Sequence, residues 1–382
     1  MSLRFVLAPD SFKDSMTAKQ VTNAMAAGIT NVDPYARIDK VPMADGGEGT
    51  VDTLVDATHG KKINVTVDGP IPGQKVESFF GMLGDGKTAV IEMAKASGLE
   101  LIPKNRRNPM VTTTLGTGEL IRAALDFGAQ KIIIGIGGSA TVDGGAGMAM
   151  ALGVRFMDEN GKVIIPNGSS IGRISDISVA GLDHRISETE FVVASDVTNP
   201  LVGKNGAAPV FGPQKGANSS QVVQLDDNLR SYAHVIYDKL GVDVTNIPGS
   251  GAAGGVGAGL LVFTKAKLRP GIEIVEEAVG LEEKIKQADC VFTGEGSIDS
   301  QTKFGKVPFG VAKLGKKHHK PVFVETAHIG DGIGDLYDAG ISTVIDILSG
   351  VTPMAEALER GPENIERTTE NMIRIIKASS KL

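Results

Sequence analysis

An apolar run that opens into a long glycine-rich loop is the feature that most constrains the fold of this 382-residue chain. Lys131-Ile-Ile-Ile leads directly into Gly135-Ile-Gly-Gly-Ser-Ala-Thr-Val-Asp-Gly-Gly-Ala-Gly147. Glycines leave backbone N–H groups uncovered, so such a loop can close around a phosphate or a small carboxylate. Comparable loops occur at residues 43–50, 249–259 and 293–299. Together they predict a cleft that binds small anions.

Strand signals alternate with helix signals along most of the chain. A capping box from Thr17 to Gln20 opens a first helix, and a second helix follows the loop at Asp45 and stops at Gly60. A third helix is expected at 117–127. Strands are expected at residues 3–8, 38–43, 131–136, 191–194, 290–293, 321–324 and 344–348. This order predicts an α/β protein with a largely parallel sheet.

Residues 62–94 have a different pattern. Three β-rich segments, 63–67, 75–80 and 88–93, follow one another without a helix between them. Antiparallel hairpins within a mixed sheet would explain this, and they indicate a second domain. We expect residues 1–68 and 285–382 to form one discontinuous domain, and residues 69–284 to form the inserted one.

Composition excludes several classes of protein. The net charge of −6 and the pI near 5.6 argue against nucleic acid or an anionic membrane as the main partner. No apolar run approaches the length of about 18 residues that a membrane span needs. The N-terminal apolar stretch is too short for a signal peptide, so a cytoplasmic protein is expected. The single cysteine, Cys290, excludes an internal disulfide and is expected to be a buried packing thiol.

Two nucleotide-binding motifs match by letter but not by context. Gly81-Met-Leu-Gly-Asp-Gly-Lys-Thr88 fits the Walker A pattern, yet Asp85-Gly86 is typical of a type I′ hairpin turn and a return strand follows. The segment 135–140 fits a loose dinucleotide fingerprint, with Asp158 or Glu159 at about the required distance. Asp143, however, would place a carboxylate near the pyrophosphate, where the two negative charges would repel each other. This argues against a dinucleotide site.

Acids and lysines lie at several expected strand ends. Asp196 follows strand 191–194, where a carboxylate can hold Mg²⁺ or accept a proton from a substrate hydroxyl; a turn-making role before Asn199-Pro200 is the alternative. Lys13 can neutralise phosphate, while Ser11 beside it can serve as a helix cap. Such carboxylates, lysines and open N–H groups are the parts that phosphoryl transfer requires.

Two further segments, a long loop and a lysine-rich run with two histidines, do not by themselves indicate a function. The loop at 203–216 fits a lid over the site as well as an ordinary surface loop. His318 and His319 lie in a lysine-rich run that indicates a solvated helix end rather than a metal site.

Six motifs in register carry a family resemblance over nearly the whole chain. They are Asp10-Ser-Phe-Lys13, Met43-Ala-Asp-Gly-Gly-Glu-Gly-Thr50, Thr112-Thr-Thr-Leu-Gly-Thr-Gly-Glu119, Gly137-Gly-Ser-Ala-Thr-Val-Asp-Gly-Gly145, Asp196-Val-Thr-Asn-Pro200 and Gly294-Glu-Gly-Ser-Ile-Asp-Ser-Gln-Thr302. The chain thereby closely resembles the bacterial class I glycerate kinases. The resemblance implies a Rossmann- or flavodoxin-like domain with an inserted α/β domain containing a mixed sheet, and an active site between them.

The resemblance also implies ATP- and Mg²⁺-dependent phosphorylation of D-glycerate, with 2-phosphoglycerate as the expected product. Catalytic roles fall to Asp10, Lys13, Asp196 and Lys306, and Asp196 is also the metal candidate. The expected substrate-binding residues are Asp45, Gly46, Gly47, Glu48, Gly137, Gly138, Ser139 and Asp143. The expected nucleotide-binding residues are Gly294, Glu295, Asp299 and Thr302, of which Glu295 and Asp299 position the nucleotide or a metal.

Three points stay open at this level. The glycerate carboxylate can rest on loop 137–145 or on loop 45–50, and Asp196 can be base or metal ligand. Asp14 stands where the family usually has glycine, and residues 324–330 replace a small Gly-Ser type loop. The oligomeric state is also undecided, with a homodimer as one candidate.

Two other functions compete with the kinase. An NAD-dependent oxidoreductase acting on a small hydroxy acid would use loop 135–147. A regulator that senses sugar acids would need a basic helix for contacting DNA, which the sequence does not offer.

Overall fold

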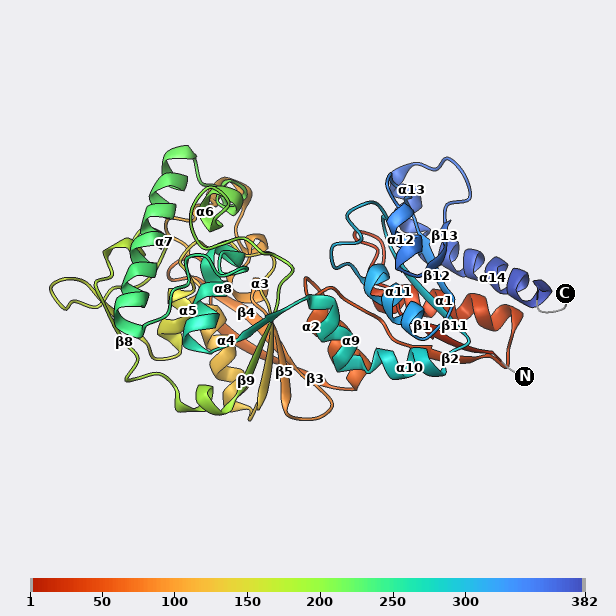
Figure 1. The fold of residues 1–382 in the computed structure, drawn as a ribbon, viewed down its shortest axis with the longest axis horizontal. Helices are drawn as coiled ribbons and strands as arrows, with labels where there is room; N and C mark the ends of the chain where they lie inside the picture. Colours follow the sequence, from red (N-terminus) through yellow and green to blue (C-terminus); the bar gives the residue numbers. More distant parts are fainter. Residues whose placement is uncertain (1–2, 380–382) are drawn as a thin grey trace. The chain divides into compact units, whose positions relative to one another are not determined.

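The structure is a computed structural model that describes residues 3–379. The chain divides into two compact units. Unit 1 comprises Met1–Asp45 and Ile272–Leu382, and unit 2 comprises Gly46–Gly271. In the colours of Figure 1, the red end and the cyan-to-blue end of the chain therefore build unit 1, and the orange-to-teal middle builds unit 2.

Unit 1 contains a five-stranded parallel sheet. Its strands, in the order β13-β12-β11-β1-β2, are β13 (Ile341–Asp346), β12 (Val322–Thr326), β11 (Cys290–Glu295), β1 (Arg4–Leu7) and β2 (Arg37–Lys40). Numbered along the chain within this unit, that order is the flavodoxin-like 2-1-3-4-5. The expected parallel-sheet domain is confirmed.

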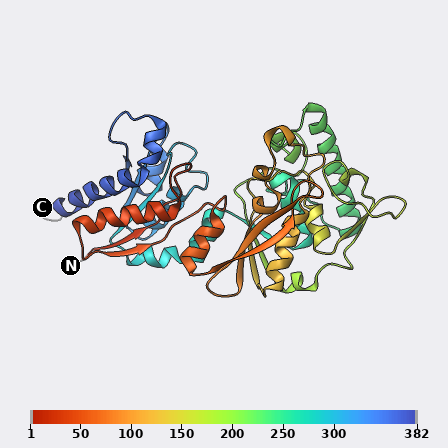
Figure 2. The ribbon, with the colours of Figure 1, turned by 180° about the vertical axis from the view of Figure 1, so that it is seen from behind.

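Helices cover both faces of this sheet. α1 (Ala18–Val32) and α14 (Gly361–Ser379) run side by side (Figure 2) and share a core with Phe5 and Phe292. They approach closely, since a Cβ on Gly28 would lie 2.4 Å from the carbonyl oxygen of Glu366. A second core contains Val324 and residues of α11 (Val307–Lys317) and α12 (Gly334–Ala339). The remaining helices are α9 (Gly271–Val279), α10 (Leu281–Gln287) and α13 (Met354–Glu359).

The predicted capping box is present at the start of α1. Thr17 Oγ1 accepts a hydrogen bond from the Gln20 N–H at 3.3 Å, and Gln20 Oε1 accepts one from the Thr17 N–H at 2.9 Å. Two N–H groups that the helix itself cannot bond are thereby satisfied. This fixes where the chain turns after β1, and Thr17 rather than Ser11 caps the helix.

Unit 2 contains a six-stranded mixed sheet in the order β10-β9-β6-β5-β4-β3. The strands are β10 (Lys267–Arg269), β9 (Glu190–Ala194), β6 (Lys131–Gly135), β5 (Thr88–Glu92), β4 (Lys75–Met82) and β3 (Lys61–Asp68). β3, β4 and β5 pair antiparallel, whereas β5, β6, β9 and β10 are parallel. The predicted mixed sheet is confirmed. A separate two-stranded sheet joins β7 (Arg155–Met157) and β8 (Asp176–Ser178).

The stretch that matches Walker A is a hairpin, as predicted. It connects β4 to β5, and the Leu83 carbonyl accepts a hydrogen bond from the Gly86 N–H at 2.9 Å. The predicted type I′ turn is wrong: Gly86 has φ of +67°, but Asp85 is not among the residues with positive φ. A type I′ turn needs positive φ at both central residues.

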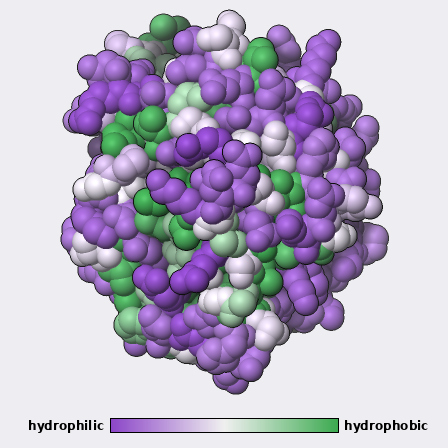
Figure 3. All heavy atoms as spheres, turned by 90° about the vertical axis from the view of Figure 1, so that its left-hand side faces the viewer, coloured by the Kyte–Doolittle hydropathy of each residue, from purple (hydrophilic) through white to green (hydrophobic). Residues whose placement is uncertain are grey.

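Seven α-helices and two buried clusters complete the described part of unit 2. One cluster includes Phe80, Ile91 and Leu120 around the sheet, and the other includes Phe156 and Tyr232. The helices are α2 (Thr50–Thr58), α3 (Ala94–Ser97), α4 (Leu115–Asp126), α5 (Ala146–Ala151), α6 (Ala207–Phe211), α7 (Ser219–Leu240) and α8 (Ala252–Phe263). On the face of unit 2 seen in Figure 3, hydrophilic residues predominate and hydrophobic ones form small, interrupted patches.

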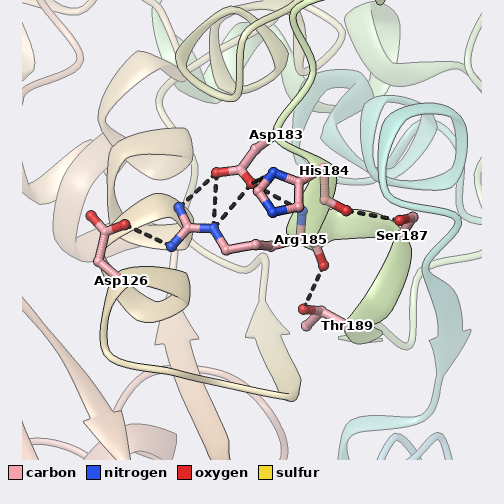
Figure 4. Close-up of polar contacts among 6 residues, drawn as sticks. All are labelled: Asp126, Asp183, His184, Arg185, Ser187 and Thr189. Atoms are coloured by element: carbon pink, nitrogen blue, oxygen red, sulfur yellow. Dashed lines mark hydrogen bonds and ion pairs between the residues drawn. The ribbon is translucent and has the colours of Figure 1, made fainter.

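A surface network anchors the segment that leads into β9. Arg185, in the short 3₁₀ helix His184–Glu188, bonds Asp183 Oδ2 at 2.7 Å and reaches Asp126 Oδ1, on α4, at 2.8 Å (Figure 4). Its neighbours raise the pKa of the guanidinium, with the Asp183 hydrogen bond as the largest cause. Exposed pairs of this kind contribute on the order of 0–1 kcal/mol, so the network positions a loop more than it stabilises the fold.

The unit boundaries differ from the predicted ones at 68/69 and 284/285. β3 pairs along its full length with β4, and α2 packs on β4, where a Cβ on Gly81 would lie 2.5 Å from Val55. Residues 46–68 therefore belong to unit 2. Residues 272–284 belong to unit 1, because α9 packs on α11, where a Cβ on Gly310 would lie 2.6 Å from Ile272.

Candidate active site

The sheet of unit 1 has a topological switch point between β1 and β11. Strand connections leave these neighbours in opposite directions, and ligands of such folds bind beyond the carboxyl ends of the strands there. Asp10 follows β1, and Glu295 is the last residue of β11. The Asp10 N–H donates to the Gly294 carbonyl at 2.9 Å, so the two loops leave the sheet together.

Three acids, Asp10, Asp45 and Glu295, form an acidic cluster at this point. Burial, followed by the charge of Asp45, raises the pKa of Asp10 to about 7, and the charge of Glu295 acts in the same direction. The hydrogen bond from the Ser11 N–H to Asp10 Oδ1, at 2.6 Å, opposes the rise. A carboxyl that titrates near neutral pH inside a ligand-binding edge is suited to exchange protons with a substrate.

Glu295 organises the loop that follows β11. Its Oε1 accepts hydrogen bonds from Thr302 Oγ1 at 2.9 Å and Lys306 Nζ at 3.2 Å, and burial raises the pKa of this carboxyl. Thr302 Oγ1 also accepts from the Asp299 N–H at 3.2 Å. Lys306 is the N-cap residue of α11, so a cation stands at the start of that helix. Unit 1 thus brings together Asp10, Asp45, Gly294, Glu295, Asp299, Thr302 and Lys306.

Lys13 and the two family departures also lie in unit 1. Lys13 is exposed, and its N lies 3.9 Å from where a Cβ on Gly296 would sit. Asp14 has φ of +63°, a conformation that glycine adopts freely and aspartate tolerates better than most residues. In the segment 324–330, the His328 carbonyl accepts from the Ile298 N–H at 2.9 Å. This departure therefore borders the loop that carries Asp299.

In unit 2, the loop before α2 crosses the carboxyl ends of β6 and β9. A Cβ on Gly135 would lie 2.6 Å from the Gly46 carbonyl oxygen, and one on Gly46 would lie 2.7 Å from Ala194 Cβ. Only glycine permits this approach. Glu48 forms an ion pair with Lys95 of α3 at 3.3 Å. Gly47 lies between Gly46 and Glu48 in the loop before α2.

Residues 137–145, the glycine loop, follow β6 at the same edge. Gly137 and Gly138 are exposed, and the loop is fixed by hydrogen bonds from the Leu99 N–H to the Gly138 carbonyl and from the Ala140 N–H to the Ser97 carbonyl, both 2.9 Å. Ser139, in contrast, is buried. The predicted glycines Gly46, Gly47, Gly137 and Gly138 thus share the carboxyl edge of one sheet.

Asp143 is fully buried inside this loop. Its Oδ2 accepts from the Thr114 N–H and Thr114 Oγ1, each at 2.8 Å, and from the Gly147 N–H at 3.3 Å; its Oδ1 accepts from the Gly145 N–H at 3.1 Å. Burial raises the pKa of this carboxyl, against those hydrogen bonds. The structure thus shows Asp143 organising the loop, while direct contact with substrate stays a prediction.

Sequence reasoning missed two buried charged residues at this edge. Glu92, the last residue of β5, accepts from the Val51 N–H at 2.8 Å through Oε1, so a carboxylate stands at the N-terminus of α2. Lys215 is 2% exposed, and its Nζ donates to Ser139 Oγ at 2.6 Å and to the Thr141 carbonyl at 2.7 Å. Glu92 could have been predicted as a site residue, because it is an acid at the end of an apolar strand. For Lys215 the only signal was its place between glycines in loop 203–216.

Asp196 follows β9 by two residues and is exposed. Mg²⁺ is usually held by one or two carboxylates together with substrate phosphates, and the Asp196 carboxylate fits that donor set. Within residues 3–379, no group of three or more His, Cys, Asp or Glu side chains could hold a metal. A role of Asp196 in holding Mg²⁺ stays a prediction.

Three further expectations concern residues away from these strand ends. Cys290 is buried in β11, and burial raises the pKa of its thiol to about 11, as expected for a packing residue. His318 lies at the end of α11 and is hydrogen-bonded to Glu282 at 2.8 Å. The described residues contain no helix long and apolar enough to cross a membrane.

Fold and site define a two-unit α/β protein: unit 1 carries acids and lysines, and unit 2 carries exposed glycines and buried charged residues, each at the carboxyl ends of its own parallel strands. A family model described as the glycerate kinase family matches residues 5–377. The chain belongs to that family.

Relatives that match over nearly the full length of the chain support the same family. The chain is 50% identical over 370 residues to the glycerate 2-kinase of Escherichia coli K12, covering 97% of each protein. It is 48% identical over 380 residues to the glycerate kinase of Bacillus subtilis 168, covering 100% of this chain and 99% of the relative. A solved structure from Salmonella typhimurium LT2, described as a candidate glycerate kinase 2, matches with a TM-score of 0.93 and 47% identity over 100% of both chains.

Proposed function

We propose that this protein transfers the γ-phosphoryl group of ATP to the 2-hydroxyl of D-glycerate, giving 2-phosphoglycerate. The observation that carries the proposal is the 50% identity, over 97% of both chains, to a relative named glycerate 2-kinase. The acids, lysines and exposed glycines at the two sheet edges supply the groups that phosphoryl transfer needs.

In unit 1, Asp10 acts as the general base that accepts the hydroxyl proton. The pKa of about 7 supports this role, because a base that titrates near the working pH is most effective. Lys13 and Lys306 offset charge on the transferring phosphoryl group. The nucleotide is bound by the loop after β11, through Gly294, Glu295, Asp299 and Thr302.

In unit 2, the glycerate carboxylate rests on the exposed N–H groups of the glycine loop. A carboxylate already stands at the N-terminus of α2, which favours this loop over residues 45–50 for binding another anion. Gly46, Gly47 and Glu48 line the substrate together with Asp45, the adjoining residue of unit 1, and Ser139 and Asp143 hold the loop in shape.

Asp196 would hold Mg²⁺ together with the ATP phosphates. Bound there, the ion would neutralise negative charge on the phosphates and orient them. The homodimer and the cytoplasmic location stay predictions.

The product of the reaction tests the proposal directly. Incubation with ATP, MgCl₂ and D-glycerate is followed by a proton-coupled ³¹P spectrum. Phosphate on the secondary hydroxyl couples to one neighbouring proton and gives a doublet, whereas phosphate on the primary hydroxyl couples to two and gives a triplet. A doublet is expected. A triplet would reject the 2-phosphoglycerate assignment. In a parallel incubation of D-glycerate with NAD, NADH formation would favour the oxidoreductase instead, provided that the incubation with ATP releases no ADP.

Asp196→Asn tests the metal role. We expect kcat to fall by about 10²-fold or more, and excess MgCl₂ to recover part of the loss. Asp227→Asn is the matched control, since Asp227 is an exposed acid on α7 with no proposed role. A near wild-type rate for Asp196→Asn would remove this residue from the mechanism.

A further inference from the structure

Lys215 is a buried charged group to which the proposed mechanism gives no role. It lies in the short 3₁₀ helix Pro213–Lys215, between Gly212 and Gly216. Gly216 has φ of +96°, and a Cβ there would lie 2.3 Å from the Arg107 carbonyl oxygen, so the backbone is packed tightly at this point. The lysine side chain is thereby directed inward, where it is 2% exposed.

The ammonium group of Lys215 is held by neutral oxygens. Its Nζ donates to Ser139 Oγ at 2.6 Å and to the Thr141 carbonyl at 2.7 Å. Both acceptors belong to the glycine loop, directly after the exposed Gly137 and Gly138. A single side chain from a distant segment therefore fixes the half of the loop that follows its open backbone.

The charged surroundings of Lys215 compensate it only in part. Asp143 acts on it through space, while the Asp143 oxygens accept hydrogen bonds from Thr114, Gly145 and Gly147. Tyr232, on α7, is also acted on by the charge of Asp143, and the carbonyl of Arg107 faces Gly216. Burial lowers the pKa of Lys215 to about 7, and Asp143 opposes the decrease. A buried ammonium in this setting is favoured by any added negative charge nearby.

We propose that Lys215 is a positioning residue for the phosphotransfer reaction: it fixes Ser139 and Thr141 behind the exposed glycines and supplies the positive charge that favours an anionic group of the acceptor substrate on this loop. The inference rests on the proposed function, in which the glycerate carboxylate binds the glycine loop.

Charge linkage follows from this placement. An anion on the loop stabilises the protonated form of Lys215, so substrate binding above neutral pH draws a proton from the solvent. Because burial lowers the pKa of Lys215 to about 7, most Lys215 side chains are neutral at pH 8, and D-glycerate binding should take up a large part of one proton per site. A role in loop shape alone would produce no such uptake.

The test compares D-glycerate binding by calorimetry at pH 8 in buffers of different ionisation enthalpy, which gives the number of protons taken up. We expect uptake by the wild type and by Lys204→Met, the control at an exposed lysine of the same segment. Lys215→Met should take up fewer protons than the wild type, since only other groups such as Asp10 can then contribute, and should raise KM for D-glycerate by about 10-fold or more, with KM for ATP nearly unchanged. Lys215→Arg, which keeps the charge but does not titrate, should recover part of the affinity with the same reduced proton uptake as Lys215→Met.

Absence of proton uptake by the folded wild-type enzyme would overturn the proposal, and this measurement needs no variant. Gly137→Val separates the two levels of inference, because nothing lies within 4 Å of a Cβ at Gly137 and the added side chain would enter the open face of the loop. If Gly137→Val leaves KM for D-glycerate unchanged, the role of the loop itself fails. If Gly137→Val raises KM and Lys215→Met does not, only the role of Lys215 fails.

Discussion

Unit 1 and unit 2 both place charged residues at the carboxyl ends of parallel strands, but they treat those charges in opposite ways. In unit 1, Asp10 is half-buried and crowded by like charges from Asp45 and Glu295. In unit 2, Asp143 and Lys215 are buried and bonded to backbone and hydroxyl groups. The first arrangement leaves a carboxyl poised to exchange a proton, and the second uses charge to shape a loop.

The difference has a measurable consequence. A charge that mainly exchanges protons with a ligand contributes to rate, whereas a charge enclosed by donors contributes to the free energy of unfolding. Substitutions at the two edges should therefore separate activity from stability.

The largest effect is expected for Asp143→Ala. The change leaves the N–H groups of Thr114, Gly145 and Gly147 without their acceptor and removes the negative charge near Lys215. The free energy of unfolding should fall by about 3–5 kcal/mol, as when one partner of a buried charged network is removed. Urea titration followed by circular dichroism measures it. Asp227→Ala, at an exposed acid of the same unit, should change stability by no more than about 0.5 kcal/mol. Equal stability of the two variants would show that Asp143 does not hold the loop.

Asp10→Asn should show the opposite behaviour. Loss of the base lowers kcat by about 10²-fold, which corresponds to about 2.7 kcal/mol in the barrier, while the unfolding midpoint stays near that of the wild type. Because the carboxyl must be deprotonated to accept a proton, wild-type kcat/KM should fall as the pH drops below about 7, and Asp10→Asn should lose this decline.

Asp14→Asn is the control for Asp10→Asn. Asp14 is exposed, and asparagine tolerates its φ of +63°. It should retain wild-type activity and the same pH profile. An acid limb that persists in Asp10→Asn would assign the limb to another group and remove Asp10 as the base.

The same contrast explains what sequence could reveal. Strand ends are encoded locally, by apolar runs that stop at glycine or an acid, so Asp10, Asp196 and the glycine loop could be placed at sheet edges in advance. The mixed sheet could also be predicted from the sequence, because β3, β4 and β5 follow one another without a helix. These features depend on neighbours in the chain.

Lys215 depends on residues far away in the chain. Its acceptors Ser139 and Thr141 precede it by more than 70 positions, and lysine is otherwise a surface residue, so nothing local indicated burial. The predicted unit boundaries differ from those of the compact units for a similar reason. The pairing of β3 with β4 assigns residues 61–68 to unit 2, and a pairing partner cannot be predicted from one strand alone.

Unit 1 also contains a fully buried carboxyl, that of Glu325. Glu325 lies within β12 and is fully buried; its Oε1 accepts from Thr369 Oγ1 of α14 at 2.7 Å, and its Oε2 is without a partner among the described residues. Burial raises the pKa of this carboxyl to about 8, against the hydrogen bond from Thr369. Unit 1 thus also encloses a charged group, but within the core beside α14. If enclosure rather than location decides the role, Glu325 should affect stability and leave catalysis unchanged.

Glu325→Gln tests this with a defined sign. Between the ordinary glutamate pKa of 4.5 and about 8, the unfolded chain is deprotonated while the folded protein keeps its proton. Wild-type stability should therefore decrease as the pH rises through this window, by up to about 1.4 kcal/mol per pH unit. Glu325→Gln does not titrate, so its stability relative to the wild type should improve by about 2 kcal/mol between pH 5 and pH 7, measured by urea titration at each pH. Glu363→Gln, at an exposed glutamate of the neighbouring helix α14, should follow the wild-type pH dependence. Parallel curves for wild type and Glu325→Gln would mean that the folded protein already holds this carboxyl ionised, and enclosure would then no longer explain the difference between the two units.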